Sequence, residues 1–208
     1  MPLLRRGRGV LLIISGPAGS GKTTLCERLF QTHSPRLSKV VTATTRAPRE
    51  GENDGVDYRF LTEEVFDAKL ADDAFCEHAV VHGKRYGVLK SEILGKLEKG
   101  RDLVLCIDVQ GADNLRRAAK TDDSLKISLA DLFVMPASLE VIRQRLENRG
   151  SDGEEEINLR LRMAKEEIAH WRKYDYCIVS GNKDEDFARV DAIYSSEVAR
   201  VSRLTEAG

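Results

Sequence analysis

Short apolar runs alternate along the chain with longer segments in which apolar residues recur every three or four positions. The runs predict buried strands at residues 10–15, 103–107, 132–135 and 176–179. The periodic segments predict helices at residues 22–31, 113–120, 139–148, 154–171 and about 184–203. Strands that alternate with helices are typical of a parallel sheet covered by helices. The pattern therefore predicts an α/β core.

Two stretches interrupt this alternation. Residues 38–100 contain strand-like pieces at 39–45 and 74–81 with polar, glycine-bearing connections, which predicts a smaller mixed lobe. Residues 149–160 join two charged helices through a glycine-bracketed turn, which is typical of a mobile lid. We therefore expect one domain in three parts, namely a core (about 9–37, 101–138 and 172–208), a lobe (about 38–100) and a lid (about 139–171).

Composition narrows the class of protein. The chain has 208 residues, of which 41% are hydrophobic and 32% charged, so it can bury a core without disulfides or a metal. Thirty-three basic and 34 acidic residues give a net charge of −1, which favours neither a nucleic-acid nor a membrane partner. The apolar run at residues 10–14 is far shorter than the ~20 residues of a membrane span. It is also too short for a signal peptide, so we expect a cytoplasmic protein.

Cysteine and histidine suggest no chemistry of their own. The four cysteines are scattered, with no paired spacing and no histidine at a zinc-ligand distance. Each lies in an apolar or periodic stretch, so we expect all four to be small core residues in a reducing compartment. The four histidines have no carboxylate at a telling spacing and receive no role.

The first strand is followed directly by a phosphate-binding motif. Residues 16–23 read G-P-A-G-S-G-K-T, which satisfies G-x-x-x-x-G-K-[ST] between a buried strand and an amphipathic helix. Glycines let backbone N–H groups turn toward phosphate oxygens, and the helix beginning near Lys22 adds its positive end. Lys22 would reach the β- and γ-phosphates, and the Thr23 hydroxyl would hold Mg²⁺. The predicted nucleoside triphosphate site comprises Gly16, Pro17, Ala18, Gly19, Ser20, Gly21, Lys22, Thr23 and Thr24.

A carboxylate follows the second core strand. Asp108 comes directly after residues 103–107, where a side chain can face a ligand at the carboxyl edge of the sheet. Alone it could equally be a solvated strand end. Beside an intact phosphate loop it becomes a candidate for the Mg²⁺ shell or for the second substrate.

Further motifs resemble one family. They are T-T-R-A-P-R-E-G-E at 44–52, G-V-D-Y-R-F at 55–60, R-Y-G at 85–87, I-D-V-Q-G-A at 107–112 and R-L-E-N-R-G at 145–150. In this order they closely resemble guanylate kinases, from about residue 11 to residue 199. The resemblance implies a P-loop nucleoside-monophosphate-kinase fold with a parallel core sheet, a mixed GMP-binding lobe and a helical lid. It also implies the reaction ATP + GMP = ADP + GDP, a step of purine nucleotide metabolism.

The residues support an acceptor phosphate site. Arg46 and Arg49 lie three positions apart around a proline, so their guanidinium groups can converge on one phosphate. Tyr58 and Tyr86 can add phenol donors. The resemblance implies that all four hold the acceptor phosphate, and that Arg46 also lies near the transferred group.

Glu77 matches the base-reading carboxylate of the family. Guanine presents two adjacent donors, N1–H and the 2-amino group, and one carboxylate can accept both. Adenine has no proton on N1 and no 2-amino group, so it would leave the carboxylate unpaired. Thr42 and Asp108 match further contacts on the guanine side.

Phosphoryl transfer needs in-line positioning and positive charge on the equatorial oxygens. The resemblance implies that Lys22, Mg²⁺, Arg46 and two lid arginines, Arg149 and Arg160, supply this charge. Arg143 and Arg145 flank the lid and are secondary candidates. The attacking group is already a phosphate anion, so no general base is required.

Three positions depart from the family pattern. Val88 replaces the usual Ser or Thr against guanine O6, so either the pocket lacks a donor there or the valine packs inward. Cys106 replaces a common acidic residue, and residues 180–182 read S-G-N where an Asn-Asp stretch is more usual.

Two other functions compete with a GMP kinase. One is a related binding module that holds a phosphorylated peptide without chemistry, and the other is a small-molecule kinase with a different acceptor. The intact Lys22–Thr23 motif in a single-domain chain argues against the first, and Glu77 with the arginine pair argues against the second. The sequence does not indicate an oligomeric state.

Lys22→Ala should lower turnover by several orders of magnitude and leave the fold intact, because Lys22 is a phosphate ligand outside the core. Steady-state kinetics and circular dichroism of the variant test this. A variant that keeps more than about a tenth of wild-type kcat would contradict the assignment of the phosphate loop.

Overall fold

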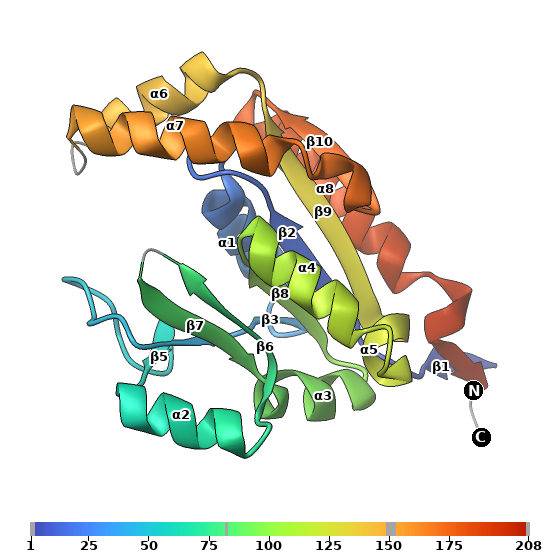
Figure 1. Ribbon diagram of the computed structural model, residues 1–208. Helices are drawn as coiled ribbons and strands as arrows, with labels where there is room; N and C mark the ends of the chain where they lie inside the picture. Colours follow the sequence, from blue (N-terminus) through green and yellow to red (C-terminus); the bar gives the residue numbers. More distant parts are fainter. Residues whose placement is uncertain (1–2, 82, 149–152, 207–208) are drawn as a thin grey trace.

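A five-stranded sheet organises the chain, whose computed structural model describes residues 3–81, 83–148 and 153–206 (Figure 1). The strand order is β10-β9-β2-β8-β3 and every pairing is parallel. The strands are β2 (Leu11–Ser15), β3 (Leu37–Lys39), β8 (Asp102–Cys106), β9 (Leu129–Pro136) and β10 (Tyr176–Ser180). The four predicted core strands are confirmed. β9 begins earlier than expected, because Leu129 to Asp131 also pair with β2.

Helices cover both faces of this sheet. Successive side chains of β2 point to opposite faces, and all of them are buried. Leu12 and Ile14 pack with α1 (Lys22–His33) and α8 (Lys183–Val198), whereas Leu11 and Ile13 pack with the helices of the other face. Those helices are α3 (Lys90–Glu98), α4 (Val109–Ala118) and α5 (Asp123–Ser128). A strand buried on both sides explains the continuous apolar run in the sequence.

The lobe is built on a second sheet of order β5-β4-β7-β6. Its strands are β4 (Thr42–Thr44), β5 (Tyr58–Phe60), β6 (Phe75–Val81) and β7 (Lys84–Leu89). Helix α2 (Glu63–Ala71) packs on it through Phe66, which stacks on Phe75 with ring centroids 4.5 Å apart. The predicted strand at residues 39–45 is wrong as one element. The backbone leaves the core sheet after Val40, whose N–H donates to Val104 O, and enters the second sheet at Thr42.

The segment predicted as a lid contains a helical hairpin with its own small core. α6 (Leu139–Glu147) and α7 (Glu154–Ile168) pack through Ile142, Leu146, Ile157 and Ala164. The Ser138 hydroxyl accepts a hydrogen bond from Val141 N at 3.2 Å, as expected of an N-cap. The hairpin projects over the carboxyl edge of the core sheet (Figure 1).

Several predicted helix ends shift. The helix expected at 113–120 begins at Val109, because the Asp108 side chain accepts from Gly111 N at 2.7 Å and caps it. The helices expected to reach residues 171 and 203 end earlier and are followed by the 3₁₀ turns η1 (Trp171–Lys173) and η2 (Val201–Arg203).

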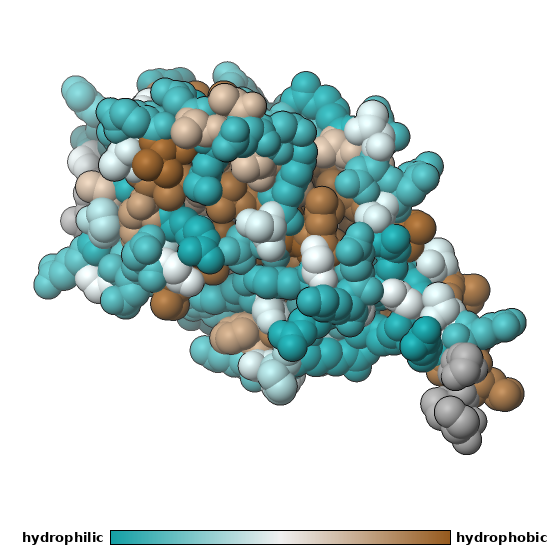
Figure 2. All heavy atoms as spheres, turned by 90° about the horizontal axis from the view of Figure 1, so that it is seen from below, coloured by the Kyte–Doolittle hydropathy of each residue, from teal (hydrophilic) through white to brown (hydrophobic). Residues whose placement is uncertain are grey.

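The two ends of the described chain lie together. β1 (Leu4–Arg6) pairs antiparallel with β11 (Leu204–Glu206), near the two ends of the chain (Figure 1). The Arg6 guanidinium donates to both oxygens of Asp102 and so connects this pair to the core. Figure 2 shows hydrophilic side chains over most of one face, with apolar side chains in recesses between them. In the described part of the chain, no helix is long and apolar enough to cross a membrane.

Asp102→Ala should lower the free energy of unfolding by about 3 kcal/mol or more. The fully buried Asp102 carboxylate accepts from Arg6, Val10 N and Tyr194 OH, so its loss leaves three sets of donors unpaired. Urea unfolding measures the change. The control is Asp184→Ala, which removes an 87% exposed partner of Arg28 and should cost about 0.5 kcal/mol. Equal losses in the two variants would contradict the structural role of Asp102.

Candidate active site

The phosphate loop joins β2 to α1 in a conformation that requires glycine. Gly16 has φ +137°, and a Cβ there would lie 2.5 Å from Val134 O. The Lys22 Nζ donates hydrogen bonds to Gly16 O at 2.6 Å and to Pro17 O at 2.8 Å. The loop is therefore closed around its own lysine, which places a cation and a helix N-terminus at one point.

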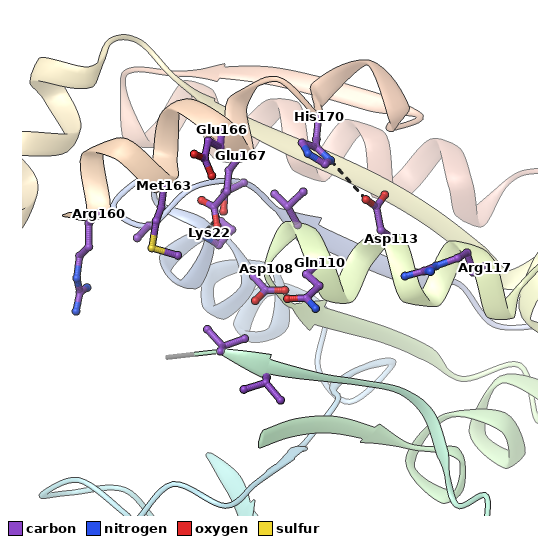
Figure 3. Close-up of a pocket in the computed structure, with 15 residues that line it drawn as sticks. Lys22, Asp108, Gln110, Asp113, Arg117, Arg160, Met163, Glu166, Glu167 and His170 are labelled. Atoms are coloured by element: carbon purple, nitrogen blue, oxygen red, sulfur yellow. Dashed lines mark hydrogen bonds and ion pairs between the residues drawn. The ribbon is translucent and has the colours of Figure 1, made fainter. Parts of the chain in front are cut away.

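A cavity of about 480 Å³ lies in front of this loop (Figure 3). Lys22 lines it from the loop, Asp108 from the end of β8, Val81 from β6, and Arg160 and Glu167 from α7. The Arg160 Nε donates to Glu156 Oε1 at 3.1 Å on the same helix. Arg149, the other predicted lid arginine, lies outside the described residues. Lys22 and Arg160 thus line one cavity, the first from the loop and the second from α7.

A second cavity, of about 210 Å³, brings together most of the predicted acceptor residues. It is lined by Thr42, Tyr58, Glu77, Tyr86 and Asp108, which come from β4, β5, β6, β7 and the β8–α4 junction. Asp108 and Val81 line both cavities. Two ligands bound in the two cavities would therefore meet at Asp108.

Glu77 is a buried carboxylate that lacks a cation. Its side chain is almost fully buried, and burial together with the charge of Asp108 raises the pKa of Glu77 to about 8. Asn114 Nδ2 donates to its Oε2 at 3.4 Å, which lowers the pKa only in part. The ion pairs of the described chain do not include Glu77. A ligand that presents N–H donors to this carboxylate would relieve the cost of burying it.

The two lobe arginines are held by one carboxylate. Arg46 Nη2 donates to both oxygens of Glu52 at 2.8 Å, and Arg49 N donates to Glu52 Oε2 at 2.8 Å. The Arg46 guanidinium lies 5.2 Å from the Tyr58 ring centroid. Burial lowers the pKa of Arg46, but its interactions with Glu52 and then with Tyr86 outweigh burial and raise that pKa. Arg46 does not line either cavity. It lies behind the two tyrosines that do.

Arg49 lines a neighbouring cavity of about 330 Å³, which shares Thr42, Tyr58 and Cys106 with the cavity of Glu77. The Arg46–Glu52–Arg49 cluster therefore borders the predicted acceptor site, and an incoming phosphate would compete with Glu52 for its donors.

The oxygen ligands in this site suit a Mg²⁺ ion whose coordination shell is completed by phosphate oxygens. Thr23 is exposed on the first turn of α1, with its Oγ1 3.9 Å from Cys106 Sγ, and Asp108 follows Cys106 by two residues. The described residues contain no group of three Cys, His, Asp or Glu side chains that could hold a metal by themselves. A hydroxyl and one carboxylate fit a hard cation that takes its remaining ligands from phosphates and water.

The positions that depart from the family pattern have three different outcomes. The side chain of Val88 is fully buried among core residues such as Leu97, so it packs inward and does not line the cavity of Glu77. Ser180 Oγ accepts from Arg145 at 3.3 Å in a cavity of about 260 Å³ beside the phosphate loop. Thr24, the last residue of the predicted triphosphate site, also lines this cavity.

A hydrogen bond with Cys26 and the charge of Lys22 lower the pKa of Cys106 to about 6, although burial opposes this.

The prediction that all four cysteines are core residues is wrong for Cys177. It is exposed on the outer face of β10, an edge strand, whereas Cys26 is buried and Cys76 and Cys106 are half-buried.

Three residues of the site escaped prediction. Glu52 lies inside a recognised motif, six residues after Arg46, but nothing in the sequence pairs them. Asn114 reaches Glu77 across 37 positions. Glu167 lies seven residues after Arg160, a helical spacing that places both on one face, and this is the only signal that could have found it.

Comparisons with known proteins agree with the geometry. The family model described as guanylate kinase matches residues 8–197. A guanylate kinase of Clostridium perfringens (strain SM101 / Type A) is 42% identical over 202 residues, covering 97% of this chain and 90% of the relative. One of Maricaulis maris (strain MCS10) is 46% identical over 189 residues, covering 90% and 82%. A crystal structure of guanylate kinase from Anaplasma phagocytophilum has a TM-score of 0.76 and 32% identity, covering 96% of this chain and 92% of that one.

Val88→Thr should lower the free energy of unfolding by about 1–2 kcal/mol, because it places a hydroxyl in an apolar cluster without adding a donor to the cavity. Chemical denaturation measures the loss, and steady-state kinetics should show no gain in kcat/KM. A more active and equally stable variant would mean that this side chain faces the ligand.

Proposed function

The chain belongs to the guanylate kinase family, and from this we propose how its residues carry out the family's reaction. The enzyme transfers a phosphoryl group from ATP to GMP and releases ADP and GDP. The observation that carries the proposal is the junction of the two cavities at Asp108, because it lets donor and acceptor phosphates meet.

ATP binds with its phosphates on residues 16–24. Backbone N–H groups of the loop and the N-terminus of α1 face the phosphate oxygens, and Lys22 exchanges its two loop carbonyls for the β- and γ-phosphates. The nucleoside of ATP lies toward the cavity lined by Arg145 and Ser180.

GMP binds in the lobe cavity with its base against Glu77. The carboxylate accepts from guanine N1–H and the 2-amino group, and Thr42 and Asp108 complete the base side. Tyr58 and Tyr86 donate to the phosphate, with Arg46 and Arg49 behind them. Charge on this phosphate draws Arg46 away from Glu52.

Transfer is a direct in-line displacement. An oxygen of the GMP phosphate attacks the γ-phosphorus, and the bond from that phosphorus to the β,γ-bridging oxygen breaks. Lys22, Arg46, Arg149 and Arg160 place positive charge around the transferred group. Thr23 and Asp108 would hold Mg²⁺, which neutralises phosphate charge when it is bound.

We place the enzyme in the cytoplasm, in purine nucleotide metabolism. The four cysteines are unpaired, as expected in a reducing compartment. The intact phosphate loop, with Lys22 bound to its carbonyls and Thr23 on the first turn of α1, supports a catalytic role over the phosphopeptide-binding alternative.

Glu77→Gln should reduce kcat/KM for GMP by a factor equivalent to at least ~2 kcal/mol. An amide can accept only one of guanine's two donors and turns its own N–H₂ toward the other. KM for ATP should change little, because Glu77 lies in the other cavity. Steady-state kinetics with each substrate varied in turn provide the measurement.

The matched control is Glu64→Gln, an exposed glutamate on α2 of the same lobe, which should leave GMP kinetics unchanged. The pH profile adds a second readout. Protonation blocks the acceptor, so wild-type kcat/KM for GMP should rise as the pH approaches the Glu77 pKa of about 8. The variant should lose this rise. Unchanged GMP kinetics in Glu77→Gln would show that another group reads the base.

A further inference from the structure

Glu167 projects from α7 into the phosphate cavity, opposite the loop (Figure 3). Arg160, Met163, Glu167 and His170 lie on one face of this helix and its C-terminal turn, and all four line the cavity. Glu167 is half-buried there, together with Lys22 and Asp108. An acidic side chain thus occupies the cavity that receives phosphates.

The charge of Glu167 is poorly compensated. Burial raises the pKa of its carboxyl to about 7, Asp108 adds to the shift, and Lys22 opposes it without cancelling it. The Lys22 Nζ is already bound to two loop carbonyls. In the described part of the chain, the Glu167 carboxylate forms no ion pair and no side-chain hydrogen bond; only the backbone oxygen of Glu167 accepts, from His170 N at 3.1 Å. The Glu167 carboxylate therefore has no ion-pair partner in the described part of the chain, although Lys22 and Arg160 line the same cavity.

Neighbouring acidic residues differ from Glu167. Glu156 pairs with Arg160, and Asp113 pairs with Arg116 and Lys173. Glu166 is exposed. Glu167 is the carboxylate on α7 that combines partial burial, a position in the cavity and the absence of an ion pair in the part of the chain described.

We propose that Glu167 makes the phosphate site selective for metal-bound ATP over metal-free ATP. A free triphosphate would bring its full negative charge against Glu167 and Asp108, in a partly buried cavity where repulsion is weakly screened. A divalent cation on the phosphates removes much of that repulsion, so the same carboxylate penalises only the metal-free form. Glu167 is here a specificity-determining residue, and its role rests on the proposed placement of ATP over Lys22.

The test compares ATP dissociation constants in EDTA and in saturating Mg²⁺, measured by titration calorimetry without GMP. Glu167→Gln should bind metal-free ATP more tightly. The ratio of the metal-free to the Mg²⁺ dissociation constant should fall about threefold to tenfold, as expected for removing one nearby like charge. Glu167→Asp keeps the charge and should retain most of the wild-type ratio.

Glu155→Gln removes one exposed carboxylate from the first turn of the same helix, away from the cavity, and should leave the ratio unchanged. Circular dichroism shows whether each variant folds. An unchanged ratio in folded Glu167→Gln, or an equal fall in Glu155→Gln, would overturn the inference. Lys22→Ala distinguishes a failure of the Glu167 role from a failure of the proposed ATP site. If this variant binds metal-free and Mg²⁺-bound ATP as tightly as wild type does, ATP does not bind over Lys22, and the proposed ATP site is wrong.

Discussion

The parallel alignment of the five core strands is the constraint on which the rest of the structure depends. It brings the carboxyl ends of β2, β8 and β10 to one edge of the sheet, where the phosphate loop follows β2, Asp108 follows β8 and Ser180 ends β10. Burial of both sheet faces makes this edge rigid, because the apolar side chains of β2 are packed from both sides. The lobe and the α6–α7 hairpin add their side chains to an edge that the core has already built.

Each of the two cavities contains a carboxylate without an ion-pair partner in the described chain, namely the buried Glu77 in one and the half-buried Glu167 in the other. Glu77 and Glu167 have pKa values raised to about 8 and about 7, and neither forms an ion pair in the described chain. Burying such groups costs stability, which a ligand of the right chemistry recovers on binding. Guanine offers N–H donors to Glu77, and metal-bound phosphates suit Glu167 better than bare ones. In the mechanism that we propose, the same physical cost serves base selection in one cavity and donor selection in the other.

Much of this arrangement could be predicted from sequence where the signal is local. The apolar runs located the core strands, and G-P-A-G-S-G-K-T located the loop and its lysine. Prediction failed where the outcome depends on distant neighbours. The run at 39–45 looks continuous in the sequence, but β3 and β4 belong to different sheets. The direction of the Val88 side chain could be decided only from the core residues that surround it in the structure. Three further features depend on tertiary packing and have no local signal. They are the ion pair of Glu52 with Arg46, the contact of Asn114 with Glu77, and the position of Glu167 in the cavity of the phosphate loop.

We infer that GMP binds with its base against Glu77 and with its phosphate directed toward ATP where the two cavities meet at Asp108. The most direct measurement is kcat/KM of the wild-type enzyme for GMP, AMP, CMP and UMP, with ATP and Mg²⁺ at saturation and ADP release as the signal. The account predicts that GMP exceeds each other nucleotide by about 10³-fold or more, because only guanine pairs both of its donors with the buried Glu77 carboxylate. Comparable use of AMP, or no nucleotide-dependent ADP release, would contradict it.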